Sequence, residues 1–179
     1  AKQSVADVWN ARFGIYKNGD PGPSVNHPDT TGYAYTPTNW KNSVPQNAYA
    51  GQALNTCHST ADNFKTKQLS YASYDNTGTS VSSGDAITGL QMSGGYKKLA
   101  TPAMAGEHQQ LGHSRRIVTV PVINTSSKVL DFACMLILQP MTSPTVDIQM
   151  EFIGNATAAN SPCSTNGASA GGSGASVPV

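Results

Sequence analysis

The segment "GEHQQLGH", residues 106–113, contains the side chains best suited to metal chemistry: Glu107, His108 and His113. Two histidines on one helix face reach a single zinc ion when they lie four residues apart, with a glutamate between them as the base. Here the histidines are five residues apart and the glutamate precedes both. On a helix this spacing turns the two rings ~140° away from each other. A secreted metal-dependent hydrolase using these residues is an alternative function, and a polar connection with hydrogen-bonded histidines is the interpretation we favour.

No other segment has the spacing of a catalytic motif. The sequence contains no GxSxG elbow, no phosphate-binding loop and no Cys-x-x-Cys pair. We therefore predict that the protein is not an enzyme, with no catalytic residue, no metal site and no cofactor.

Aromatic residues in the polar segment 18–83 suggest a second alternative, a carbohydrate-binding adhesin. Exposed aromatic rings between polar residues can stack on sugars, and the candidates are Tyr33, Tyr35, Trp40 and Tyr49. Aromatic residues in a long loop more often anchor it to the core. We favour this role for them, together with Phe64 and Tyr71.

Charged residues make up only 12% of the chain, and 11 basic against 10 acidic side chains leave a net charge of +1. No broad surface of one sign is available to attract nucleic acid or an anionic membrane. No apolar run reaches the ~18 residues that a membrane-spanning helix needs.

The sequence begins at Ala1 without a methionine or a signal peptide, which predicts a processed product or a fragment.

The elements that must position these side chains begin with an amphipathic helix predicted over residues 4–17. Its apolar residues recur at spacings of three and four: Val5, Val8, Trp9, Phe13 and Tyr16. Residues 18–83 are rich in proline, glycine and polar residues, which predicts long irregular loops.

Strand patterns follow from residue 85. We predict a strand over 85–92, a turn and a short extended piece over 94–104, and a connection over 107–115. Three consecutive strands at 116–123, 129–139 and 146–154 have short connections, which favours an antiparallel meander. Pro121 places the first of them at an edge or a bulge. Apolar residues at nearly every position after Asp131 predict that the second is covered on both faces or partly wrapped by other elements.

The predicted fold class is therefore α+β: an N-terminal amphipathic helix packed on a mainly antiparallel β-sheet, with long irregular loops. We expect a single domain over residues 1–163 with its sheet core at 85–154. A flexible Gly/Ser/Ala-rich tail follows at 164–179.

The last predicted strand, "VDIQMEF" at 146–152, alternates apolar and polar residues. The apolar side chains should cover the core, and Asp147, Gln149 and Glu151 should face water or a partner. The edge strand containing Val118 and Val120 could accept a strand from another protein. These five residues form the candidate partner surface.

The chain has three cysteines, an odd number. Cys134 lies in an apolar run, where it is either a small buried hydrophobic residue or half of a disulfide with Cys163 or Cys57. Closing a loop of roughly 30 residues would stabilise the fold by about 3 to 4 kcal/mol in the chain-entropy model.

An ordered set of segments carries a family resemblance. "RRIVTVPVI", "FACMLILQP", "EFIGNA" and "SPC" resemble the C-terminal region of TadE/TadG-like proteins, which serve assembly of tight-adherence (Flp) type IV pili in bacteria. "WNARFGIY" and "ATPAMAGEHQQLGHSRR" are also similar to sequences of that group, and the likeness is strongest over residues 87–163.

The resemblance implies a non-enzymatic, extracytoplasmic accessory protein of a pilus or secretion apparatus. Its expected partners are other pilus assembly proteins or pilin, and self-association is left open. Family members usually carry an N-terminal membrane anchor, which this sequence lacks. The resemblance also implies a Cys134–Cys163 disulfide with Cys57 as the odd thiol, and it carries over no catalytic residue.

Overall fold

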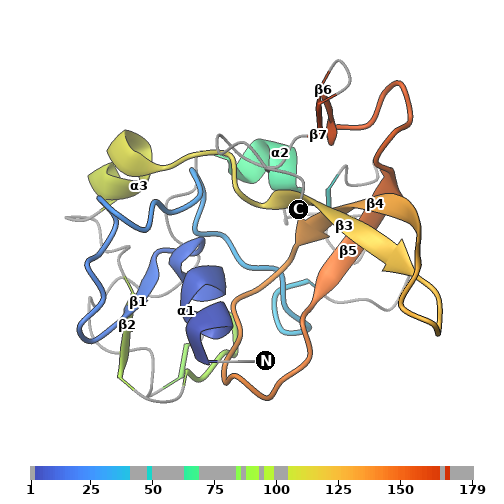
Figure 1. Ribbon diagram of the computed structural model, residues 1–179. Helices are drawn as coiled ribbons and strands as arrows, with labels where there is room; N and C mark the ends of the chain where they lie inside the picture. The colour runs from blue at the N-terminus through green and yellow to red at the C-terminus, as the bar shows by residue number, and fades with distance from the viewer. Residues whose placement is uncertain are drawn as a thin grey trace.

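The computed structural model describes residues 3–40, 48–49, 63–68, 84–85, 88–92, 95–98, 105–165 and 168–169. In these residues an N-terminal helix, α1 (Gln3–Ala11), lies beside an antiparallel sheet (Figure 1). The strand order of the sheet is β3 (Ile117–Ile123), β4 (Val129–Ile137) and β5 (Met150–Asn155). The predicted α+β fold class is confirmed. Within the predicted tail, β6 (Ser164–Thr165) pairs with β7 (Ala168–Ser169), and the rest of that tail lies outside the described residues.

Helix α1 ends earlier than predicted, at Ala11 and not at residue 17. Short-range hydrogen bonds tighten the chain here, and Gly14 then adopts a φ of 69°. This left-handed conformation is accessible to glycine at little cost, so it can redirect the backbone. The chain continues into β1 (Ile15–Lys17), which pairs with β2 (Tyr96–Lys98), a strand inside the predicted extended piece.

The buried face of α1 differs from the predicted stripe. Trp9 is buried, but Val5 and Val8 are 46% and 48% exposed. The fully buried Asn10 docks the helix instead: its Nδ2 donates to the carbonyl of Met141 at 2.9 Å, and its Oδ1 accepts from the N–H of Met141 at 2.8 Å. The apolar spacing did not predict which face of the helix is buried, because the polar side chain of Asn10 is on that face and Val5 and Val8 are not.

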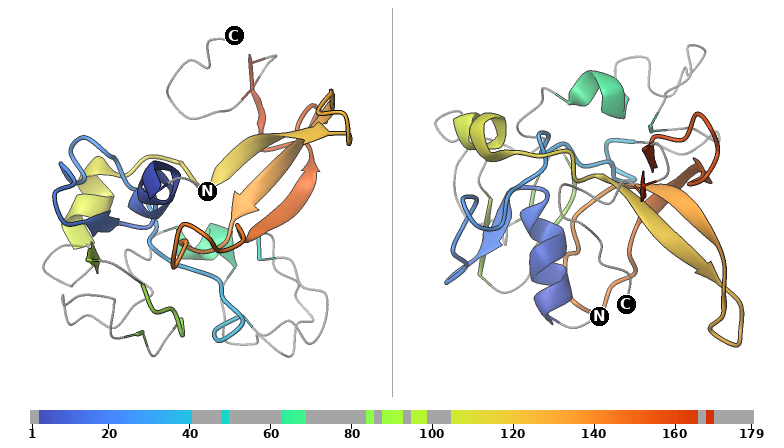
Figure 2. Two further views of the ribbon diagram at one scale, coloured as in Figure 1. Left: turned by 60° about the horizontal axis from the view of Figure 1, so that its bottom comes forward. Right: turned by 45° about the horizontal axis from the view of Figure 1, so that its top comes forward.

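The antiparallel meander is confirmed by β3 (Ile117–Ile123), β4 (Val129–Ile137) and β5 (Met150–Asn155) (Figure 2). The turn at 124–128 forms because the Asn124 side chain accepts from the N–H groups of Ser126 and Lys128, both at 2.9 Å. Strand β3 lies at an edge, as Pro121 predicted. Of the β4 positions after Asp131, Phe132 is exposed and residues 133–137 are buried or half-buried, so the strand is only partly covered by other elements.

The sheet separates two buried clusters. Ile137 of β4 packs in a cluster with Trp9 and Phe13, whereas its neighbour Leu136 packs with Tyr35, Trp40, Ala48 and Phe64. Successive strand residues point to opposite faces, so these clusters lie on the two sides of the sheet.

Two other predicted elements are wrong. The described residues of 85–92 form no strand: Asp85 N bonds to Leu90 O at 2.9 Å, and the Asp85 carboxylate accepts from the N–H and hydroxyl of Thr88, which closes a turn. The helix α3 (Ala105–Leu111) occupies the first part of the predicted connection at 107–115 and begins two residues before it. A second short helix, α2 (Phe64–Lys67), lies in the predicted loop region and is capped by Asn63.

Candidate functional site

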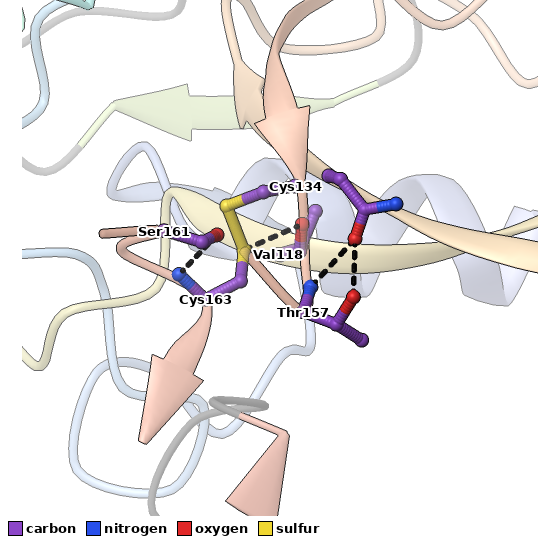
Figure 3. The surroundings of a disulfide bond; sticks show 6 residues. Val118, Cys134, Thr157, Ser161 and Cys163 are labelled. Atoms are coloured by element: carbon purple, nitrogen blue, oxygen red, sulfur yellow. Dashed lines mark hydrogen bonds between the residues drawn. A yellow bond between two sulfur atoms is a disulfide. The ribbon is translucent and has the colours of Figure 1, made fainter. Parts of the chain in front are cut away.

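A disulfide joins Cys134, in the middle of β4, to Cys163, as the family resemblance implies (Figure 3). The Cα atoms are 5.6 Å apart, and the bond closes a sequence separation of 29 residues. Both cysteines are buried beside Ala156. Cys57 lies outside the described residues. Disulfides of this kind persist in oxidising compartments.

Local hydrogen bonds shape the segment that leads to Cys163. The Asn155 side chain accepts from the N–H and hydroxyl of Thr157 at 2.8 and 2.6 Å, and Ser161 Oγ accepts from the N–H of Cys163 at 3.2 Å (Figure 3). The segment thus folds back over the face of the sheet that carries Cys134. The disulfide fastens it there.

The candidate partner surface divides into exposed and engaged residues. Asp147 and Gln149 are exposed, as predicted. Glu151 is half-buried, and its carboxylate accepts from the N–H groups of Ala48 and Tyr49 at 2.7 and 3.2 Å. Glu151 is therefore engaged within the chain and only partly open to water or a partner, unlike Asp147 and Gln149. Burial raises the pKa of Glu151, and the two N–H donors oppose that rise.

The apolar side of β5 is also more exposed than predicted. Met150 packs against the buried cluster of Trp9, Phe13 and Ile137, here called the α1 cluster, but Phe152 is 63% exposed. Val146 and Ile148, which precede the strand, are 38% and 43% exposed. On this face the core covers Met150 but not Phe152, whereas Ile153 packs against the clusters that contain Leu136 and Cys134. The pattern showed which side chains share a face, but not how far the covering layer extends.

The two edges of the sheet differ in their protection. In the β3–β4 pair, Ile137 N bonds to Arg116 O, so Ile117, Thr119 and Pro121 direct their backbone groups away from β4. Pro121 has no N–H to offer, and the register shifts between Val122 and Ile123. Proline and bulges are devices that prevent unwanted strand pairing. Edge β3 is therefore a poorer strand acceptor than predicted, and its Val118 is half-buried against the α1 cluster.

The β5 edge has no proline, and its only register shift with β4 lies at Ile153, between Phe152 and Gly154. Leu138 N bonds to Gln149 O, so Met150 and Phe152 direct their N–H and C=O groups outward. These outward groups make no hydrogen bond within the part of the chain that the structure describes. No proline occurs between residues 146 and 155.

The end of the β3–β4 hairpin carries further exposed apolar side chains. They are Val122, Ile123, Val129, Leu130 and Phe132, each between 42% and 63% exposed. Figure 1 shows this hairpin projecting from the rest of the sheet. They lie on both faces of the hairpin, because successive strand residues point to opposite sides. Several exposed apolar side chains gathered in one part of a fold are a common feature of interaction sites.

Glu107, His108 and His113 do not converge. His108 is fully buried, and its Nδ1 donates to the carbonyl of Asp29 at 2.8 Å. His113 is exposed, and its ring lies edge-on to His27 with centroids 4.6 Å apart. The described residues include no group of three or more histidine, cysteine or acidic side chains that could hold a metal ion.

Burial lowers the pKa of His108, so the unfolded chain takes up a proton before the folded one does. Stability should therefore fall as the pH drops below the ordinary histidine pKa of about 6.5, by up to about 1.4 kcal/mol per pH unit. We expect urea unfolding between pH 7 and 5 to show a shallower pH slope for His108→Leu than for the wild type. Asp29 and Arg116, the charged neighbours, are the same in both proteins. Equal slopes would contradict the prediction.

The loop aromatics serve as anchors. Tyr35, Trp40 and Phe64 are buried, and Tyr33 and Tyr49 pack against them. Tyr35 lies edge-on to both Tyr33 and Trp40. These side chains therefore do not form the exposed sugar-stacking platform considered above, and Tyr71 lies outside the described residues.

No protein-family model, curated protein or solved structure matches this chain. Over the described ranges, the helices are too short or too polar to cross a membrane.

Proposed function

We propose that this chain is a non-enzymatic structural or accessory protein of a bacterial type IV (Flp/Tad) pilus assembly or secretion apparatus. It acts outside the cytoplasm through contacts with pilin or other pilus assembly proteins. The observation that carries the proposal is the apolar surface at the end of the β3–β4 hairpin, exposed on a sheet that a disulfide braces.

The chemistry of the surface supports contact with proteins. The chain has few charges and a net charge of +1, so long-range attraction to a polyanion is weak. Exposed leucine and phenylalanine side chains gain most by burial against another apolar surface, about 25 cal/mol per Å². The disulfide supports an extracytoplasmic location, because thiols stay reduced in most cytosolic proteins. The ordered resemblance over residues 87–163 supports the pilus apparatus in particular.

A binding assay with purified components tests the proposal. The immobilised chain is incubated with the purified Flp pilin and pilus assembly proteins of the source bacterium. We expect Leu130→Ser to weaken binding at least tenfold, because Leu130 lies at the hairpin end and is 63% exposed. Val25→Ser is the matched control, since Val25 is equally exposed and lies far from the hairpin in the sequence.

Two outcomes would reject the proposal. One is that the wild type binds none of the pilus components. The other is that Leu130→Ser and Val25→Ser bind as tightly as the wild type, which would leave the hairpin end without a role.

A further inference from the structure

We infer that the free edge of β5, with the preceding residues 146–149, pairs antiparallel with the same edge of a second copy of this chain. The two sheets then join into one continuous six-stranded sheet about a two-fold axis at Met150. The inference goes beyond the proposed function, and either could fail without the other.

The backbone supplies the first argument. The N–H and C=O groups of Met150 and Phe152 face away from β4, and pairing with a second copy would extend the same alternation to Ile148, which precedes β5. Figure 2 (left) shows β5 as the outermost strand on its side of the sheet. An edge of this kind is a ready template for another strand. Centring the pair on Met150 gives about six new backbone hydrogen bonds by the antiparallel pattern.

The side chains make this register self-complementary. With the axis at Met150, Ile148 lies opposite the partner's Phe152, and the same contact repeats across the axis. Aromatic and β-branched residues are favourable cross-strand pairs, and Ile148 and Phe152 are 43% and 63% exposed in the single chain. On the other face Gln149 lies opposite the partner's Glu151, whose carboxylate accepts from Ala48 and Tyr49 and has lone pairs left for the Gln149 amide.

Neighbouring registers are disfavoured by charge. An axis at Gln149 would place Asp147 opposite the partner's Glu151, and an axis at Glu151 would place the two Glu151 side chains opposite each other. Like charges directly opposite each other are destabilising. Moving one strand by a single residue relative to the other would place residues whose backbone groups point outward opposite residues whose groups point toward β4, so no ladder would form. The acidic residues therefore select the Met150 axis, and the low net charge of +1 lets two copies approach.

Cysteine cross-linking tests the register. In a Cys57→Ser background, Met150→Cys places two thiols on facing residues whose Cα atoms are ~5.5 Å apart, within the span of a disulfide. Phe152→Cys is the control, because the two copies of residue 152 lie four residues apart along the strands, ~14 Å. With oxidised glutathione as the oxidant, we expect most Met150→Cys chains and under a tenth of Phe152→Cys chains to form covalent dimers.

Sedimentation equilibrium tests the association itself. The edge interface is small, so we expect a dissociation constant of roughly 10–100 μM for the wild type. Phe152→Pro removes the outward N–H and the ring without touching a bond to β4, and should abolish dimerisation. Phe152→Ala keeps the N–H and should weaken it about tenfold. A wild type that stays monomeric up to ~1 mM, or equal cross-linking of the two cysteine variants, would overturn the inference.

Discussion

Replacement of Arg116 by alanine is expected to lower the free energy of unfolding by about 3 to 5 kcal/mol. Arg116 is fully buried. Its Nε donates to the carbonyl of Ile137 at 2.8 Å and its Nη1 to that of Tyr33 at 2.7 Å. Its guanidinium also lies over the rings of Phe13 and Phe64, one from each buried cluster, at 4.1 and 5.7 Å. The variant loses these contacts, leaves buried carbonyls without a donor and opens a cavity.

Two further substitutions separate geometry from charge. Arg116→Lys keeps the charge, but a single ammonium cannot reproduce the planar fork that reaches several carbonyls, so we expect a loss of about 2 kcal/mol. Arg116→Met keeps most of the volume and still leaves the carbonyls unpaired, so it should also destabilise. Arg115→Ala is the control, because Arg115 is only half-buried and bonds to the His27 carbonyl. Urea unfolding measures all four. An Arg116→Ala protein within 1 kcal/mol of the wild type would refute the role.

The three-stranded meander was predictable because its signals are local. β-branched and apolar runs, the turn residues at 124–128 and the single proline at an edge all specify pairing between neighbours in the sequence. The Cys134–Cys163 pair could not be chosen over Cys57 from the residues alone and came from the resemblance. Helix α1 was predicted in place but too long, since the apolar spacing continues through Phe13 and Tyr16 into a strand.

Long-range polar contacts were not predictable. Asn10 with Met141, Glu151 with Ala48, and Arg116 with Tyr33 join residues that are 131, 103 and 83 positions apart. Each side chain looks like an ordinary surface residue in the sequence, because burial depends on which segments the fold brings together. His108 is a similar case: its partner is a backbone carbonyl of Asp29, which no side-chain pattern can signal.

The candidate partner surface shows where pattern reasoning stops. Alternation identified the two faces of 146–152 but assigned the core to the side on which Phe152 is 63% exposed. The sequence showed that Pro121 marks an edge but not that the same proline protects it. The comparison that matters is between a β3 edge that carries a proline and a β5 edge that carries none before its bulge at Ile153, and it requires the strand order and the hydrogen-bond register.

Removal of the Cys134–Cys163 disulfide is expected to cost about 3.5 kcal/mol of stability. The chain-entropy model gives this value for the sequence separation of 29. The cysteines are 0% and 1% exposed and pack with Ala156 and Ile153, so substitution also loses apolar contacts. The bond holds the segment that follows β5 against the sheet, where Ile117 of β3 packs against the cluster that contains Cys163 and Ala156 and the Cys163 sulfur lies near the Val118 carbonyl.

Guanidinium chloride unfolding of three proteins, all in a Cys57→Ser background, measures the effect. The oxidised chain should unfold at the highest midpoint, and the same chain reduced with dithiothreitol should fall by an amount equivalent to 2 to 5 kcal/mol. The Cys134→Ala/Cys163→Ala double variant should lie close to the reduced chain and should not respond to dithiothreitol. If reduction leaves the midpoint of the oxidised chain unchanged while thiol titration shows two new free thiols, the bond is not a stabilising brace of this sheet.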